Sequence, residues 1–157
     1  MLRKLLLVAS LVWTLPLWAA GDVIVDKVWM RESVPGQAAA TVQLNLYVTK
    51  DATLLGVASP LAASGDIRQV MKRGGQLQQR TLSELKLAAH SNTVFGERGI
   101  YLMLQGLKQP LGVGDKVPVT LSLRVGGKVR MVEAEAQVRA LELSYKHYND
   151  PAVMDHR

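Results

Sequence analysis

The residues best suited to chemistry in this sequence are methionines and histidines, because the chain contains no cysteine. Met103 lies two residues after Tyr101 in the apolar stretch GIYLMLQGL, from Gly99 to Leu107. A methionine in such a stretch is commonly core filler, but its thioether is also a soft ligand that suits Cu(I). Met103 is therefore interpreted either as a core residue or as part of a metal site.

A second group of soft donors lies near the C-terminus. His147, Met154 and His156 fall within ten residues of one another in the polar segment 141–157, which contains the turn-forming run Asn149-Asp150-Pro151. Imidazole and thioether groups both accept copper. The segment is expected to be either a plain polar tail or a tail that captures copper. The remaining histidine, His90, is expected to be a surface or capping residue.

Signatures of enzymes do not occur in this sequence. It has no cysteine nucleophile, no Gly-x-Ser-x-Gly elbow and no glycine-rich phosphate loop after a strand. Glu133 and Glu135 share one face of a predicted strand, but that face is the solvated one. The sequence predicts a protein that is not an enzyme.

The N-terminal residues 1–21 have the layout of a secretory signal peptide. Arg3 and Lys4 precede an apolar run that ends in small residues, and the best processing point follows Gly21. The alternative is an uncleaved anchor, but Thr14 and Pro16 interrupt a run that is already short for a bilayer. A lipid anchor is disfavoured because no cysteine would carry it. We therefore expect export to the periplasm and no membrane span in the mature form.

Residues 22–140 are long enough for one domain with a core and short for two. The formal charge of +6 falls to +4 once Arg3 and Lys4 are removed, and the remaining charges of both signs are scattered. This distribution favours solubility over nucleic-acid binding. The domain must also fold without a disulfide.

The pattern of apolar residues between Val23 and Val138 favours an all-β fold. Short alternating runs are separated by turn-forming pairs, which is typical of an antiparallel β-sandwich or Greek-key barrel. Two segments fit less well: Leu85 to Asn92 could be a strand or a helical turn, and residues 141–157 are expected to leave the domain as a tail.

One hairpin can be predicted with its register. A two-residue turn at Gly126-Gly127 pairs residues whose numbers sum to 253, so Leu121 faces Val132 and the inward pairs beyond it are also apolar. Close to the turn the pattern conflicts, because Leu123 faces Arg130. We expect a twist or a bulge at that point.

The order of these segments resembles the periplasmic copper chaperones of the PCu(A)C family. The matching stretches are VIVDKVWMR (23–31), AAATVQLNLYV (38–48), LLGVASPLA (54–62) and GIYLMLQGLKQPLGVGDKVPVTLSL (99–123). The last stretch is the most diagnostic. The resemblance implies a cupredoxin-like fold and a non-enzymatic protein that binds Cu(I) and delivers it to oxidase assembly.

The resemblance also implies four ligand positions: a His, ten intervening residues, a Met, twenty-one intervening residues, a second His, one intervening residue, and a second Met. With Met103 at the last position, the others fall on Arg68, Gln79 and Tyr101. Arginine is a permanent cation and no ligand, glutamine is a hard donor, and a phenol gives Cu(I) little. Copper binding is therefore expected to be weak or absent at this strand site. Arg68, Gln79 and Tyr101 are expected to form a polar cluster.

Two functions remain open. The first is a copper-handling protein that uses Met103 with His147, Met154 and His156 and passes Cu(I) to a periplasmic or membrane-bound acceptor. The second is a metal-free binding or assembly module that recognises another exported protein through the surface around Arg68, Gln79 and Tyr101.

Overall fold

The computed structural model describes residues 21–96 and 99–141. The predicted signal peptide and the predicted tail lie outside the described residues, apart from Gly21 and Leu141. Within the described ranges, no helix has the length and apolarity needed to cross a membrane.

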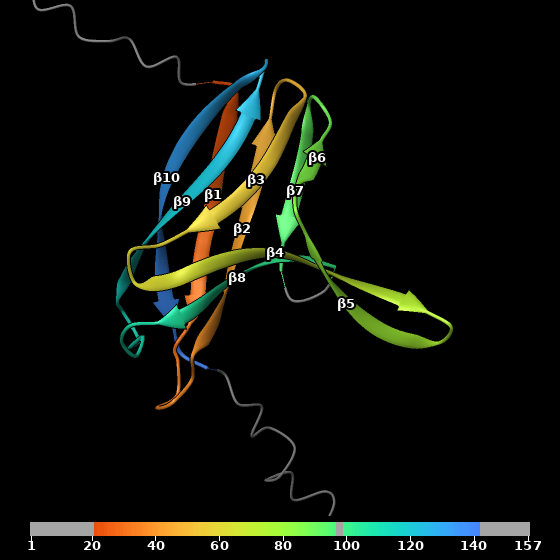
Figure 1. The fold of residues 1–157 in the computed structure, drawn as a ribbon. Helices are drawn as coiled ribbons and strands as arrows, with labels where there is room; N and C mark the ends of the chain where they lie inside the picture. The colour runs from red at the N-terminus through yellow and green to blue at the C-terminus, as the bar shows by residue number, and fades with distance from the viewer. Residues whose placement is uncertain (1–20, 97–98, 142–157) are drawn as a thin grey trace, which may run out of the picture.

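The described residues form ten β-strands, which confirms the all-β prediction (Figure 1). Their bounds are β1 Val23–Arg31, β2 Ala39–Val48, β3 Ala52–Ala58, β4 Ala62–Arg73, β5 Gln76–Leu82, β6 Leu85–Leu87, β7 Ser91–Phe95, β8 Ile100–Leu107, β9 Lys116–Val125 and β10 Lys128–Arg139.

One hydrogen-bonded path of strands runs β5-β4-β8-β2-β1-β10-β9-β3-β6, and β7 pairs with β2 beside it. All pairings are antiparallel except that of β1 with β10. The sheet rolls over, so that β3 also contacts β4 and β8. The result is the predicted cupredoxin-like sandwich.

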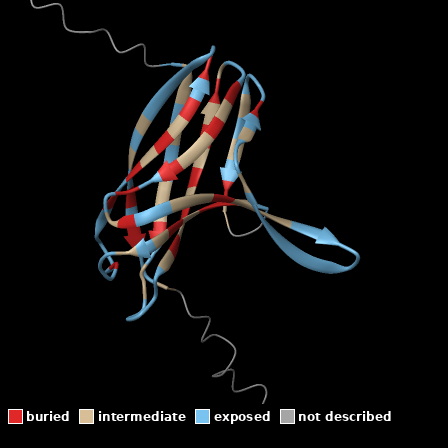
Figure 2. Ribbon diagram, in the orientation of Figure 1, coloured by how far each residue is buried: buried red, intermediate tan, exposed pale blue. Residues whose placement is uncertain are grey.

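The core lies inside this rolled sheet, because strand alternation sends every second side chain inward. In β2 the inward residues run from Ala40 to Val48 and the pattern alternates without a break. In β9 they run from Val117 to Val125. Figure 2 shows these buried positions as bands across the body of the sandwich.

The β9–β10 hairpin has the predicted register, with Val132 opposite Leu121 and Ala134 opposite Val119. Gly126 and Gly127 have φ values of 57° and 77°, and positive φ at both central residues is what a two-residue type I′ turn requires. Of the two features expected near the turn, a twist or a bulge, the bulge is wrong, because the register stays regular up to the pair of Lys128 with Val125.

Near that turn a charged residue lies opposite an apolar one, and the charged side chain finds an acidic partner at the edge of the sandwich. Arg130 lies opposite buried Leu123, yet its guanidinium reaches the carboxylate of Asp22 at 3.7 Å. Val129 and Met131 stay exposed on the other side of the strand. The register shifts occur elsewhere, between Asp26 and Trp29 of β1 and between Leu54 and Gly56 of β3.

The segment from Leu85 to Asn92 contains β6 and the start of β7, so the strand interpretation is the correct one. The turn between them includes His90, which is exposed and has a φ of 57°. A left-handed conformation of this kind is tolerated by a few polar residues. His90 is thus a surface turn residue.

Strands β4 and β5 form a hairpin that projects from the body of the sandwich (Figure 1). Residues 67–82, which make up its paired part, are here called the β4–β5 arm. The base of β4 packs tightly on β3: a Cβ atom added to Gly65 would lie 2.2 Å from the carbonyl oxygen of Val57. Only glycine fits there, and this contact fixes β4 next to the candidate site.

Candidate functional site

The strand register brings the four implied ligand positions onto one face of β5, β4 and β8. Arg68 lies directly opposite Tyr101, and Met103 lies opposite Asp66. Gln79 of β5 lies opposite Val70, two residues from Arg68 along β4. Because opposite residues and alternate residues share a face, all of these side chains belong to the same side of the sheet.

This side is the one turned away from the core, since the intervening residues Ile67, Leu102 and Leu104 are core residues. We call this side the Arg68 face, and it consists of Asp66, Arg68, Gln79, Tyr101, Met103 and Gln105.

Arg68 is held by an ion pair on its own strand. Its Nη2 lies 3.3 Å from Oδ2 of Asp66, and both side chains are about three-quarters buried. The amide of Gln105 donates a hydrogen bond to the same carboxylate oxygen. The Nε of Arg68 is buried and has no hydrogen-bond partner among the described residues.

The predicted polar cluster therefore forms with different members. Asp66 binds Arg68 and also accepts the hydrogen bond from Gln105, whereas Gln79 is exposed on the outer strand. The sequence does contain a signal for Asp66, because a carboxylate two residues before a cation lies on the same face of a strand. The hydrogen bond from Gln105 to Asp66 depends on how β8 is aligned with β4, and the spacing of Asp66 and Arg68 does not reveal that alignment.

Tyr101 and Met103 differ in their surroundings. Tyr101 is only 5% exposed although its neighbour Leu102 is also buried, so the alternation expected of a one-sided strand fails at this point. Met103 is half-buried and lies between Asp66 on β4 and Thr41 on β2. Tyr101 is therefore shielded from solvent although its register places it on the outer face, where Arg68, Asp66 and Met103 stay partly exposed.

The side chains on the Arg68 face do not suit Cu(I). Met103 is the one soft donor of the four, while the guanidinium of Arg68 is a fixed cation that repels a metal ion. Nowhere in residues 21–96 and 99–141 do three His, Cys, Asp or Glu side chains converge as a metal site would need. The other proposed donors, His147, Met154 and His156, lie outside the described residues.

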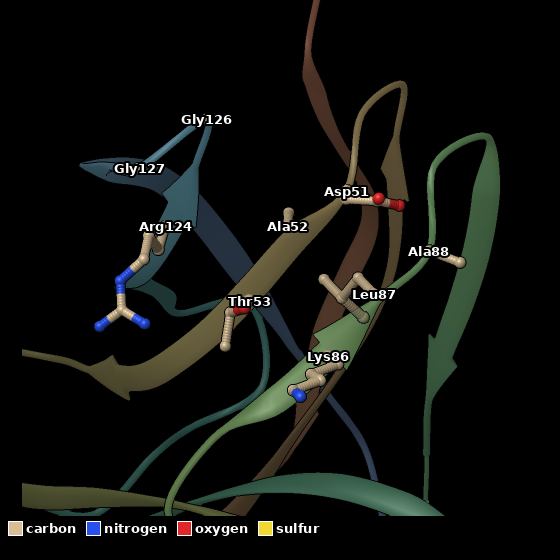
Figure 3. Close-up of a pocket in the computed structure, with 9 residues that line it drawn as sticks. All are labelled: Asp51, Ala52, Thr53, Lys86, Leu87, Ala88, Arg124, Gly126 and Gly127. Atoms are coloured by element: carbon tan, nitrogen blue, oxygen red, sulfur yellow. The ribbon is translucent and has the colours of Figure 1, made fainter.

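A pocket of about 590 Å³ lies between β3, β6 and the β9–β10 turn (Figure 3). Thr53 is at its centre, with Lys86 opposite on one neighbouring strand and Arg124 opposite on the other. Arg124 is paired at 3.9 Å with Glu84. With two cations on its walls and none of the implied ligand positions, this pocket is not a second candidate for copper.

Comparison with known proteins agrees with this fold. Residues 23–137 match the family described as putative lipoprotein LpqE-like. A relative from Leifsonia xyli subsp. xyli, named putative lipoprotein Lxx21020, is 32% identical over 108 residues, which cover 68% of this chain and 65% of the relative. The chain thus spans about two-thirds of the length of that relative.

Two solved structures give the fold. The copper-bound PCuAC domain from PmoF2 has a TM-score of 0.63 at 19% identity, covering 79% of this chain and 97% of that domain. The Cu(I) form of DR1885 from Deinococcus radiodurans has a TM-score of 0.58 at 25% identity, covering 71% of this chain and 74% of that protein. The chain belongs to the LpqE-like family and is a PCuAC-type, copper-chaperone-like domain.

Proposed function

We propose that this chain is an exported, non-enzymatic protein of the copper-chaperone class whose Arg68 face binds another exported protein and does not hold Cu(I). The observation that carries the proposal is the pairing of Arg68 with Asp66 directly beside Tyr101 and Met103. A neutralised, partly buried cation occupies the position at which the resemblance implies a histidine. Such a face suits polar contacts with a protein better than coordination of a soft metal ion.

Export to the periplasm is part of this proposal. Its support is the signal-like sequence of residues 1–21 and the description of the relative as a putative lipoprotein. Processing after Gly21 predicts that the protein recovered from the periplasm begins at Asp22. Edman sequencing or intact mass of that protein checks the position, and a chain that still carries residues 1–21 contradicts it.

A second candidate function is copper capture by the C-terminal segment, with delivery to a periplasmic or membrane-bound acceptor. It is favoured by the placement of His147, Met154 and His156 within ten residues of one another. Met103 is the soft donor at the implied ligand positions, and such a segment could complement it.

Metal content separates the two functions. The full chain is expressed into a copper-supplemented periplasm beside a variant with His147→Ala, Met154→Ala and His156→Ala. A matched control carries His90→Ala and Met131→Ala, which remove exposed donors elsewhere. The proposed function predicts no stoichiometric copper in any of the three proteins. Stoichiometric copper that is lost only in the first variant establishes the second function.

A further inference from the structure

Strand β5 is a free edge of the sheet and, at seven residues, is longer than the three-residue strand β6 at the other end of the strand order. It stands at one end of the strand order and, among the described residues, pairs with β4 alone. Residues 71–81 are all exposed, as Figure 2 shows for the projecting part of the β4–β5 arm. An edge strand of this kind leaves a row of backbone donors and acceptors without partners.

The register shows which backbone groups these are. The N–H of Val70 donates to the carbonyl of Gly99 at 2.7 Å, so Val70 and Gln79 are a pair that exchanges no hydrogen bonds. The N–H and C=O groups of Gln79 therefore point away from β4. Because backbone directions repeat every two residues along a strand, the N–H and C=O groups of Leu77 and Thr81 also point away from β4.

The side chains of the arm indicate what kind of strand would pair there. Lys72, Arg73 and Arg80 are exposed and have no acidic partner among the described residues, and residues 67–82 contain no carboxylate. Leu77 is 75% exposed beside the free edge. Two such arms would repel each other, because like charges would meet across the new strand pair. A segment with acidic and apolar side chains would be attracted instead.

We infer that the free edge of β5 binds an extended, acidic segment of another polypeptide by strand addition. This inference rests on the proposed function and specifies its partner. The added strand would bond to the backbone of Leu77, Gln79 and Thr81. On the face that carries Arg80 its carboxylates would meet that cation, and on the opposite face its apolar side chains would lie beside Leu77. It would extend the sheet of which the Arg68 face is one side.

The test uses the full-length exported protein and a fluorescein-labelled peptide of alternating valine and glutamate, about eight residues long to match one strand. Fluorescence anisotropy measures binding at two salt concentrations. The same peptide with every backbone amide N-methylated keeps its charge but loses the hydrogen-bond donors of both strand edges. Strand addition predicts saturable binding of the first peptide and loss of binding of the second.

Two substitutions at Gln79 separate backbone pairing from charge. Gln79→Pro removes an N–H that β4 does not use, so the arm keeps its ladder, whereas Gln79→Ala keeps the N–H. We expect the affinity of the proline variant to be about tenfold or more lower than that of the alanine variant, which keeps the N–H. Far-UV circular dichroism and urea unfolding check that the proline variant is folded.

Charge is tested by Arg80→Gln with Lys128→Gln as the control on a distant hairpin. The first should weaken binding and reduce its salt dependence, and the second should change neither. The inference is overturned if no acidic peptide binds, if both peptides bind alike, or if the two Gln79 variants bind alike. The inference is also overturned if vesicles of anionic lipid displace the peptide equally from wild type and from Gln79→Pro. That result would identify a membrane surface as the partner of the arm. A Cu(I) titration of the same protein bears on the proposed function alone.

Discussion

At the scale of single residues, the guanidinium of Arg68 determines the chemistry of its face. It is about three-quarters buried, and a charge in that position needs a counter-charge to be tolerated. Asp66 supplies the counter-charge and is itself held by the amide of Gln105. The pair makes the face electrically neutral at its centre and leaves Met103 beside a carboxylate.

Replacing Asp66→Asn should therefore destabilise the fold. The substitution leaves the partly buried cation of Arg68 without a negative partner, and we expect the free energy of unfolding to fall by about 1–2 kcal/mol. Urea unfolding followed by circular dichroism measures it. The control is Glu135→Gln, which breaks the exposed pair with Lys116 and should cost less than about 0.5 kcal/mol. Equal effects of the two substitutions would contradict the role given to Asp66.

Sequence reasoning reached part of this site. The spacing implied by the resemblance placed Arg68, Gln79, Tyr101 and Met103 at related positions, and the strand register puts them on one face. The partner of Arg68 was missed because an ion pair depends on side-chain directions as well as on spacing. The burial of Tyr101, which lies on the outer face of β8, was missed because alternation with a period of two predicts buried residues on one face only.

At the scale of elements, strand register could be predicted where a tight turn fixes it. The β9–β10 register follows from arithmetic, because Gly126-Gly127 admits the tight turn and the apolar pairs then align. The irregularities of β1 and β3 could not be predicted in this way. A register shift such as that between Leu54 and Gly56 is set by contacts with neighbouring strands, which alternation does not encode.

The contact of β4 with β3 gives a prediction at this scale. In Gly65→Ala the new methyl group would meet the backbone of Val57, which cannot move without disturbing β3. We expect a loss of about 2–3 kcal/mol in the free energy of unfolding. Gly56→Ala is the matched control on β3, since an added Cβ there has no atom within 4 Å. A Gly65→Ala protein as stable as the control would disprove the tight contact.

At the scale of the whole molecule, Asp22 ties the first strand to two others at one end of the sandwich. Its carboxylate accepts from Thr49 at 3.1 Å and Lys50 at 3.3 Å, and it lies 3.7 Å from Arg130 of β10. The hydrogen bonds from Lys50 and Thr49 lower the pKa of Asp22, and the charges of Lys50 and Arg130 lower it further. The strand ends β1, β2 and β10 are thereby joined through one side chain.

A lowered pKa fixes the direction of the pH dependence. The stabilising effect of ionised Asp22 is present above the pKa of an unfolded aspartate, about 3.9, and is lost as the pH falls through the lower folded pKa. Asp22→Asn should therefore be less stable than wild type near neutral pH, and the difference should shrink towards zero as the pH falls below the pKa of an unfolded aspartate and through the lower folded pKa. Urea unfolding across this range measures it. A difference that stays constant down to low pH would rule out the linkage.

The central claim is that the Arg68 face of this PCuAC-type domain does not hold Cu(I), and a titration tests it directly. The full chain with His147→Ala, Met154→Ala and His156→Ala is titrated with Cu(I) against a chromophoric chelator. A second protein adds Arg68→His, Gln79→Met and Tyr101→His, which restore the implied ligand set around Met103. We predict that the first protein leaves all the copper with the chelator and that the second removes one equivalent. Removal of one equivalent by the first protein would contradict it.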